Sequence, residues 1–304
     1  MTQLRKMMLE ELQRRNYSKT TTRSYLQIVR DFAKHFHRPP DQLGPAEIRT
    51  YQAHLLEERK LEPRTVGLYT AGLRFLFVKT LKRPYPFEEL PYPKRPRRLP
   101  IILSQEETAR LIESASNLFH RAMLTTLYST GMRRAELCRL KVEDIDGGRM
   151  IIHIRQGKGG KDRDVPLDPK LRETLREYYR WMRPKTYLFP GTENGWRADK
   201  PITAKVLWEA CQQAAQRAGI TKRVSPHLLR HSFATHLIEN GADLPTVQAL
   251  LGHADLRATS IYLHLSQRHL KAAGTPLDKI EMSSLDKVKR SRKLHPKRPP
   301  ADQK

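Results

Sequence analysis

The sequence has few of the residues that build disulfide scaffolds or metal centres. It contains two cysteines in 304 residues, Cys138 and Cys211, and both lie in apolar, helix-like contexts. We therefore expect two small buried thiols in a protein of a reducing compartment rather than a disulfide framework. No group of Cys and His residues has the spacing of a zinc site, so neither a structural metal nor a cofactor is expected.

Long apolar runs are also missing. No stretch approaches the roughly 20 apolar residues that a membrane-spanning helix needs, and the N-terminal residues lack the apolar centre of a signal peptide. We expect no membrane association, and a cytoplasmic, nucleoid-associated location of bacterial type.

Acidic residues are scarce relative to basic ones. The chain has 57 Lys and Arg against 32 Asp and Glu, a net charge of +25, and an isoelectric point of about 10.3. So large an excess repels itself unless a polyanion offsets it, so the composition favours nucleic acid as a partner and predicts salt-sensitive binding. An anionic membrane surface is a weaker alternative, because no basic amphipathic segment stands alone.

Residues 1–90 are expected to form a helical DNA-binding domain. Apolar residues follow the helical period through this segment, with breaks near residues 16–19, 38–44 and 60–63. The pattern predicts a small bundle of four helices.

A basic, proline-rich segment follows at residues 91–100. Proline stiffens this segment and removes backbone donors, so we expect an extended linker. A plain spacer is one interpretation, but the density of cations favours a linker that also follows a DNA backbone. These cations are Lys94, Arg95, Arg97 and Arg98.

Residues 101–282 are expected to form a second domain. Ser104 and Glu107 have the spacing of a capping box that opens a helix. Farther on, Gly131 breaks a helical pattern that restarts a few residues later, so Arg133 is expected at a helix junction.

The hydrophobic period changes between residues 150 and 167. Two β-rich runs flank a Gly-rich turn that contains Lys158 and Lys161, which predicts a β-hairpin. The turn lacks the P-loop pattern, so a nucleotide site is not supported. Helices are expected at residues 170–182 and 203–218, and a loop at residues 187–196.

Residues 225–262 contain the densest set of potentially reactive side chains. A Ser-Pro helix start precedes His227 and Arg230, whose spacing of three puts them on one helix face near its N-terminus. An imidazole and a guanidinium at that position suit a phosphate. His253 follows a glycine at the end of the next expected helix, and Tyr262 comes nine residues later.

This ordered set resembles the active site of the tyrosine recombinases, the phage integrase family, and in particular its Xer and phage-type branches. The resemblance covers about residues 10–280. It implies a mainly α-helical fold with a small β-hairpin or sheet: a four-helix, SAM-like core-binding domain followed by an α+β catalytic domain. The residues that match the catalytic pattern are Arg133, Lys158, His227, Arg230, His253 and Tyr262, with Glu136 in support.

The resemblance also implies roles for these residues. Tyr262 would be the nucleophile that forms a 3′-phosphotyrosyl linkage, while Arg133 and Arg230 would neutralise the nonbridging phosphate oxygens. Lys158 would protonate the departing 5′ oxygen, with Lys161 as its rival.

The histidines divide into two groups. His227 would act as a base or as a hydrogen-bond partner of the phosphate, and His253 would hold the phosphate and order the segment that contains the tyrosine. His231 and His236 are expected to be structural.

The implied function is site-specific recombination between two double-stranded DNA sites, in integration, excision or transposition. The enzyme would act as a tetramer on DNA and be a monomer or dimer when free. A type IB topoisomerase-like nicking-closing enzyme is one alternative, and a catalytically silent DNA-binding protein is another. Residues 283–304 are expected to be a disordered basic tail that tightens DNA binding.

Overall fold

A computed structural model of the chain describes residues 2–83, 91–94, 100–155, 162–193, 196–253 and 255–263. The chain divides into two compact units, unit 1 at residues 1–98 and unit 2 at residues 99–304. The predicted catalytic lysine, several predicted DNA contacts and the predicted tail lie outside the described residues: Lys158, then Arg95, Arg97, Arg98 and Lys161, and residues 283–304.

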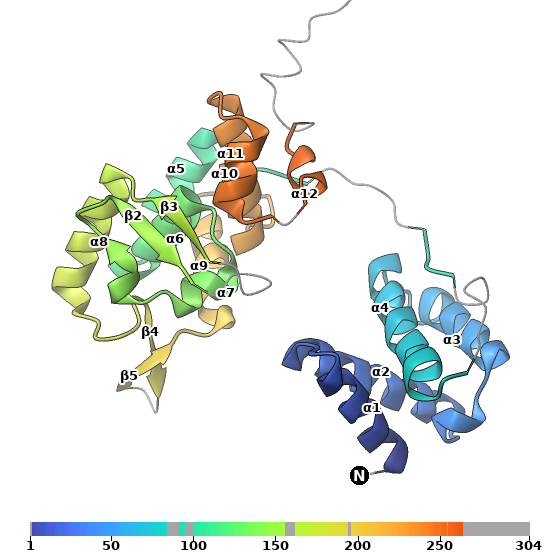
Figure 1. Cartoon of the computed structure of the whole chain (residues 1–304). Helices are drawn as coiled ribbons and strands as arrows, with labels where there is room; N and C mark the ends of the chain where they lie inside the picture. The colour runs from blue at the N-terminus through green and yellow to red at the C-terminus, as the bar shows by residue number, and fades with distance from the viewer. Residues whose placement is uncertain are drawn as a thin grey trace, which may run out of the picture. The chain divides into compact units, whose positions relative to one another are not determined.

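The described part of unit 1 is the four-helix bundle that the sequence predicts (Figure 1). Its helices are α1 (Gln3–Arg14), α2 (Lys19–Phe36), α3 (Pro45–Glu57) and α4 (Pro63–Arg74). A short 3-10 helix, η1 (Pro40–Gln42), precedes α3, and α4 continues into a π-helix, η2 (Phe75–Thr80).

Local sequence signals fix the ends of these helices. The Ser18 hydroxyl accepts a hydrogen bond from the Thr21 N–H at 3.2 Å and so caps α2. Proline occupies the first turn of both α3 and α4, where its missing N–H costs nothing. The apolar faces then meet in one core, which includes Leu12, Phe32, Ile48, Leu55, Leu73 and Phe77.

Unit 2 is mostly helical as well. Its helices are α5 (Gln105–Glu113), α6 (Leu118–Thr130), α7 (Arg134–Arg139), α8 (Pro169–Met182), α9 (Ala204–Arg217), α10 (Pro226–Glu239), α11 (Leu244–Leu251) and α12 (Arg257–Ser260), with a 3-10 helix, η4 (Val142–Asp144). Helix α6 is central, since it contacts α5, α7, α8, α9 and α10. Figure 1 shows α10, α11 and α12 gathered at one end of the unit.

A three-stranded antiparallel sheet lies between α7 and α8 in the chain. Strands β2 (Ile151–Ile154) and β3 (Arg163–Pro166) form the predicted hairpin, with Ile152 opposite Val165 in the core. The short strand β1 (Ile145–Asp146), which the sequence did not reveal, pairs with the other edge of β2.

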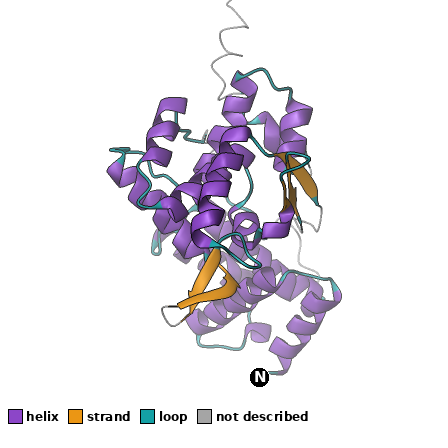
Figure 2. Ribbon diagram, turned by 90° about the vertical axis from the view of Figure 1, so that its left-hand side faces the viewer, coloured by secondary structure: helices purple, strands orange, loops and turns teal. Residues whose placement is uncertain are grey.

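The prediction of a loop at residues 187–196 is wrong. Strands β4 (Pro190–Glu193) and β5 (Trp196–Pro201) pair there as a second antiparallel hairpin (Figure 2). The segment lacks the alternation of apolar and polar residues that marks a half-buried strand, so backbone pairing alone defines it. Pro190 and Gly191 favoured a loop, but Pro190 is the first residue of β4, a position where proline is tolerated.

The predicted fold class is confirmed: helices dominate, with small antiparallel sheets in unit 2. Both cysteines are buried as expected, and burial raises the pKa of the Cys211 thiol to about 12. Within the residues that the structure describes, no helix is both long and apolar enough to cross a membrane.

Candidate active site

Arg133 lies at the junction between α6 and α7. Gly131 ends α6 in the left-handed region, with φ of 57°, and a Cβ there would lie only 2.2 Å from Cδ1 of Phe233. Arg133 is therefore the residue before the first turn of α7, and its N–H donates to Glu136 Oε2 at 2.7 Å. Its Nη1 donates to the other carboxylate oxygen of Glu136 at 2.8 Å.

Glu136 is a buried anion between two arginines. Arg163, the first residue of β3, donates to both of its carboxylate oxygens, from Nη2 at 2.7 Å and from Nη1 at 3.1 Å. Burial alone would raise the pKa of this carboxyl, but hydrogen bonds from Arg163 and from the Arg133 backbone outweigh it and lower the pKa to about 2. Glu136 is ionised at neutral pH.

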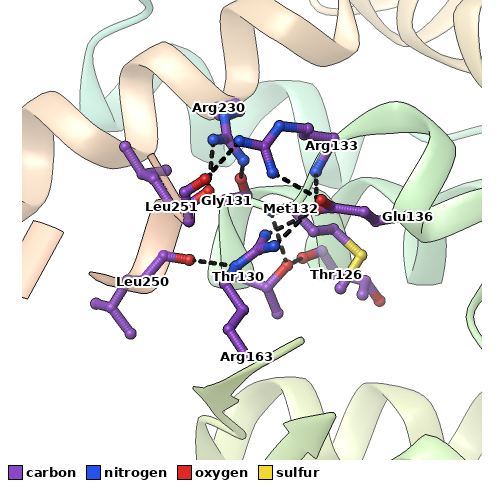
Figure 3. A network of polar contacts seen from close by, with 11 residues as sticks. Thr126, Thr130, Gly131, Met132, Arg133, Glu136, Arg163, Arg230, Leu250 and Leu251 are labelled. Carbon is purple, nitrogen blue, oxygen red and sulfur yellow. Dashed lines mark hydrogen bonds and ion pairs between the residues drawn. The ribbon is translucent and has the colours of Figure 1, made fainter. Parts of the chain in front are cut away.

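The C-terminal end of α11 contacts three arginines (Figure 3). The Leu250 carbonyl accepts from Arg163 Nε at 2.8 Å, and the Gly252 carbonyl accepts from Arg133 Nη2 at 2.8 Å. Between them, the Leu251 carbonyl accepts from Arg230 Nη2 at 2.7 Å. The last carbonyls of a helix lack intrahelical partners and have a partial negative charge, so they are good acceptors for cations.

Arg230 is a buried residue of α10, and both terminal nitrogens of its guanidinium donate to main-chain oxygens. Besides Leu251, it donates to the Gly131 carbonyl at 2.6 Å, so it links the ends of α6 and α11. Burial, with the nearby charge of Arg133, lowers its pKa to about 10, which leaves it charged at neutral pH. Two guanidinium groups therefore lie close together, neutralised in part by Glu136.

Tyr262 and His253 also lie close to the end of α11. Gly252 ends α11 with φ of 61°, and His253 Nδ1 is hydrogen-bonded at 2.9 Å to the hydroxyl of Thr259, a residue of α12. The ring of Tyr262 is stacked on that of His253, with centroids 6.4 Å apart. Tyr262 is only 1% exposed, and it packs with residues of α10 and α11.

The Tyr262 hydroxyl is hydrogen-bonded to Nδ1 of His231 at 2.9 Å. Burial raises the pKa of Tyr262, although Arg230 and Arg133 act in the opposite direction. Burial, followed by the fields of His227 and Arg230, lowers the pKa of His231 to about 4. The pair is therefore a neutral phenol beside a neutral imidazole near pH 7.

The remaining histidines differ in environment. His227 is exposed at the start of α10, with its ring centroid 4.5 Å from that of His231. His227 and Arg230 thus differ in burial, although their spacing predicts a shared helix face. His236 is buried and bonded to the Tyr128 hydroxyl at 2.8 Å. Burial lowers the pKa of His253 to about 4, helped by Arg230 and Arg133.

The structure brings five of the sequence-predicted residues to one place: Arg133, Glu136, Arg230, His253 and Tyr262. Lys94 is exposed in unit 1. Sequence reasoning missed two features of the site. One is Arg163, and the other is the contact between His231 and the hydroxyl of Tyr262. No pattern in the sequence distinguishes Arg163 from other strand arginines.

A cleft of about 500 Å³ opens beside Arg133. Its wall contains further cations, Arg139, Lys141 and Arg155, which with Arg133 outnumber the two carboxylates Glu136 and Asp144; Arg155 is paired with Asp144 at 2.8 Å. Basic side chains around a cleft next to paired arginines suit a polyanion. In the described part of the chain, no three His, Cys, Asp or Glu side chains are grouped so as to hold a metal ion.

Comparison with known proteins assigns the chain to a family. The model of the phage integrase family matches residues 102–269, and that of the SAM-like N-terminal domain of phage integrases matches residues 4–87. A putative integrase/recombinase of Sinorhizobium fredii is 47% identical over 279 residues, covering 91% of this chain and 89% of the relative.

Two further comparisons agree. The tyrosine recombinase XerA of Pyrococcus furiosus is 39% identical over 208 residues, 65% of this chain and 71% of that protein. The fold is similar to that of a lambda integrase tetramer bound to a Holliday junction, with a TM-score of 0.66 and 20% identity over 90% of this chain and 78% of that one.

The matched segments identify the chain as a protein of the tyrosine recombinase class. The chain belongs to the phage integrase family, with both its SAM-like N-terminal domain and its catalytic domain.

Proposed function

We propose that the protein is a site-specific recombinase that cleaves and rejoins DNA through a 3′-phosphotyrosyl intermediate on Tyr262. The main support is the convergence of Arg133, Arg230, His253 and Tyr262 around the C-terminal end of α11. These residues come from four separate segments, and together they provide a nucleophile and paired cations for one phosphodiester.

The two arginines would neutralise the phosphate. Each uses some of its N–H groups on protein carbonyls or on Glu136, and a guanidinium has more N–H groups than these bonds require. Their fixed positions would let them stabilise the negative charge that grows on the nonbridging oxygens in the transition state without reorganisation.

The nucleophile would replace the 5′ oxygen at phosphorus. The Tyr262 oxygen forms a bond to phosphorus while the bond from phosphorus to the 5′ oxygen breaks, and the phenolic proton passes to a neighbouring base. His231 and His227 both lie on this side of α10, and the hydroxyl of Tyr262 contacts the first of them. Because Tyr262 is buried, it would have to leave this position to reach DNA.

The leaving 5′ oxygen needs a proton, which we assign to Lys158. This lysine lies outside the described residues, in the part of the sequence between β2 and β3, and Lys161 remains its rival. The energy of the broken bond is kept in the phosphotyrosyl linkage, so a free 5′ hydroxyl could attack it and rejoin a strand without ATP.

The substrate would be double-stranded DNA, bound mainly through phosphate contacts. The net charge of +25 and the cations around the cleft beside Arg133 support a polyanionic partner. The linker cations Lys94, Arg95, Arg97 and Arg98 would add to these contacts. We propose a tetramer on two paired sites, by analogy with the lambda integrase tetramer on a Holliday junction.

Covalent trapping tests this proposal. Nicked suicide duplexes tiled across the DNA that flanks the gene are incubated with wild type or with Tyr262→Phe and resolved on a denaturing gel. We expect a protein–DNA adduct in wild type alone. An adduct that survives in Tyr262→Phe would exclude Tyr262 as the nucleophile.

A strand-exchange assay on the trapped site separates recombination from simple nicking and closing. Wild type is mixed with two labelled duplexes that contain the trapped site, and exchanged products are measured. Relaxation of supercoiled plasmid without exchanged products would favour the topoisomerase-like alternative. Tight DNA binding with neither adduct nor relaxation would favour a catalytically silent protein.

A further inference from the structure

Arg163 is a third arginine in the candidate active site that the proposed chemistry does not use. It begins β3, its side chain is only 9% exposed, and it binds Glu136 through both terminal nitrogens. Its remaining donor nitrogen, Nε, binds the Leu250 carbonyl. All three of its nitrogens therefore contact protein atoms.

These contacts connect Arg163 to the two arginines that would hold the phosphate. Glu136 links Arg163 to the backbone and side chain of Arg133, and α11 links it to Arg230, whose acceptor Leu251 follows Leu250 in the chain. The guanidinium of Arg163 thus fixes one buried anion and one helix end at the same time.

Close packing at Gly252 gives a second, independent link. A Cβ on Gly252 would lie 3.0 Å from Cδ and 3.1 Å from Nη1 of Arg163, so the side chain of Arg163 lies directly against the backbone of this glycine. Gly252 accepts from Arg133 and is followed by His253. A displacement of Arg163 would therefore displace Gly252, and with it the acceptor of Arg133 and the neighbouring His253.

We infer that Arg163 is a positioning residue for strand cleavage, acting through Glu136 and the end of α11 on Arg133 and His253. This inference rests on the proposed function. Without Arg163, the buried Glu136 carboxylate would keep only Arg133 as a partner, and the Leu250 carbonyl would lose its cation. Arg133 would then be drawn toward Glu136 and be less available to a phosphate, and small displacements of this kind reduce rates by about 100-fold.

The test compares two substrates that differ only in charge at the reacting phosphorus. One is the nicked duplex identified by trapping, and the other has a methylphosphonate at the cleaved position, in which a methyl group replaces one nonbridging oxygen. We expect Arg163→Met to slow adduct formation at saturating DNA about 100-fold on the phosphate. On the uncharged methylphosphonate the loss should be several-fold smaller, because less negative charge needs to be neutralised.

Two companion variants complete the comparison. Arg163→Lys keeps a charge but not the planar fork, so it should fold and show a smaller loss with the same difference between substrates. Arg176→Met removes a half-exposed arginine of α8 that pairs only with Glu173 among the contacts described, and should leave both rates unchanged.

Equal slowing on both substrates by Arg163→Met and Arg163→Lys, or no slowing on either, would overturn the inference. Equal slowing would mean general damage to the fold, which thermal melting of the same samples would register. If wild type itself forms no adduct with the phosphate substrate, the proposed function fails instead, so the two failures are distinguishable in one gel.

Discussion

Replacing Glu136 by glutamine tests the charge balance of the site. The carboxylate is 6% exposed and accepts four hydrogen bonds, two from Arg133 and two from Arg163. Glutamine offers one acceptor oxygen, and its amide N–H groups would face an arginine donor. The change leaves two guanidinium groups near Arg230 without their buried counter-ion.

The expected cost follows from two independent considerations. Breaking a buried ion pair by removing one partner costs about 3–5 kcal/mol. The pKa of Glu136 falls from 4.5 to about 2 on folding, which corresponds to about 3 kcal/mol of stability at neutral pH. Because the folded pKa is the lower one, this contribution is complete above pH 4.5 and is lost as the pH falls towards 2.

Urea unfolding followed by tryptophan fluorescence measures this cost. All three tryptophans, at positions 181, 196 and 208, belong to unit 2, so the signal reports on the unit that contains Glu136. We expect Glu136→Gln to lose about 3 kcal/mol at pH 7 and the difference from wild type to shrink in acid.

Glu143→Gln provides the matched control. Glu143 is 58% exposed and pairs with Lys141 and Arg155, so its loss should cost less than about 1 kcal/mol. A Glu136→Gln variant within about 1 kcal/mol of wild type at pH 7, or with a deficit that does not change in acid, would refute the reasoning.

Two further substitutions test the surroundings of the site. Gly131→Ala should lower the free energy of unfolding in urea by about 2–4 kcal/mol, because the residue has a positive φ and the new Cβ would overlap Phe233. Gly147→Ala is the control, since a Cβ at Gly147 meets open space. Equal stabilities of the two variants would contradict this account. Wild type should lose stability as the pH falls from about 6.5 towards 4, because the unfolded chain protonates His231 while the folded chain, with a pKa of about 4, does not. His231→Gln should show a shallower pH dependence of melting temperature over that window, and an unchanged slope would count against the buried neutral imidazole.

Local signals in the sequence predicted most of the elements near the site. The Ser104 capping box is present, and the hairpin of β2 and β3 pairs as its two β-rich runs indicate. These features depend on residues close together in the chain, so short-range hydrogen bonding and periodicity define them. The hairpin of β4 and β5 was missed because its pairing leaves no pattern of alternating side chains.

Burial within α10 was less predictable. Spacing put His227 and Arg230 on one face, yet His227 is exposed while Arg230 is buried. Helix α10 is surrounded by α6, α9 and α11, so most of its circumference is covered and helical periodicity alone cannot identify a solvent face. In this packed environment His231, which was expected to be structural, lies against the hydroxyl of Tyr262.

The sequence by itself determined the family, the fold class and the ordered set of candidate residues, because these depend on identities and spacings along the chain. Only the tertiary structure decided which atoms meet. Arg133, Arg163 and Arg230 come from three distant segments and converge on successive carbonyls at the end of α11. That convergence follows from the packing of α6, α10, α11 and β3. The carbonyls at the end of α11 and the carboxylate of Glu136 together supply the negative charge that lets three cations lie so close together.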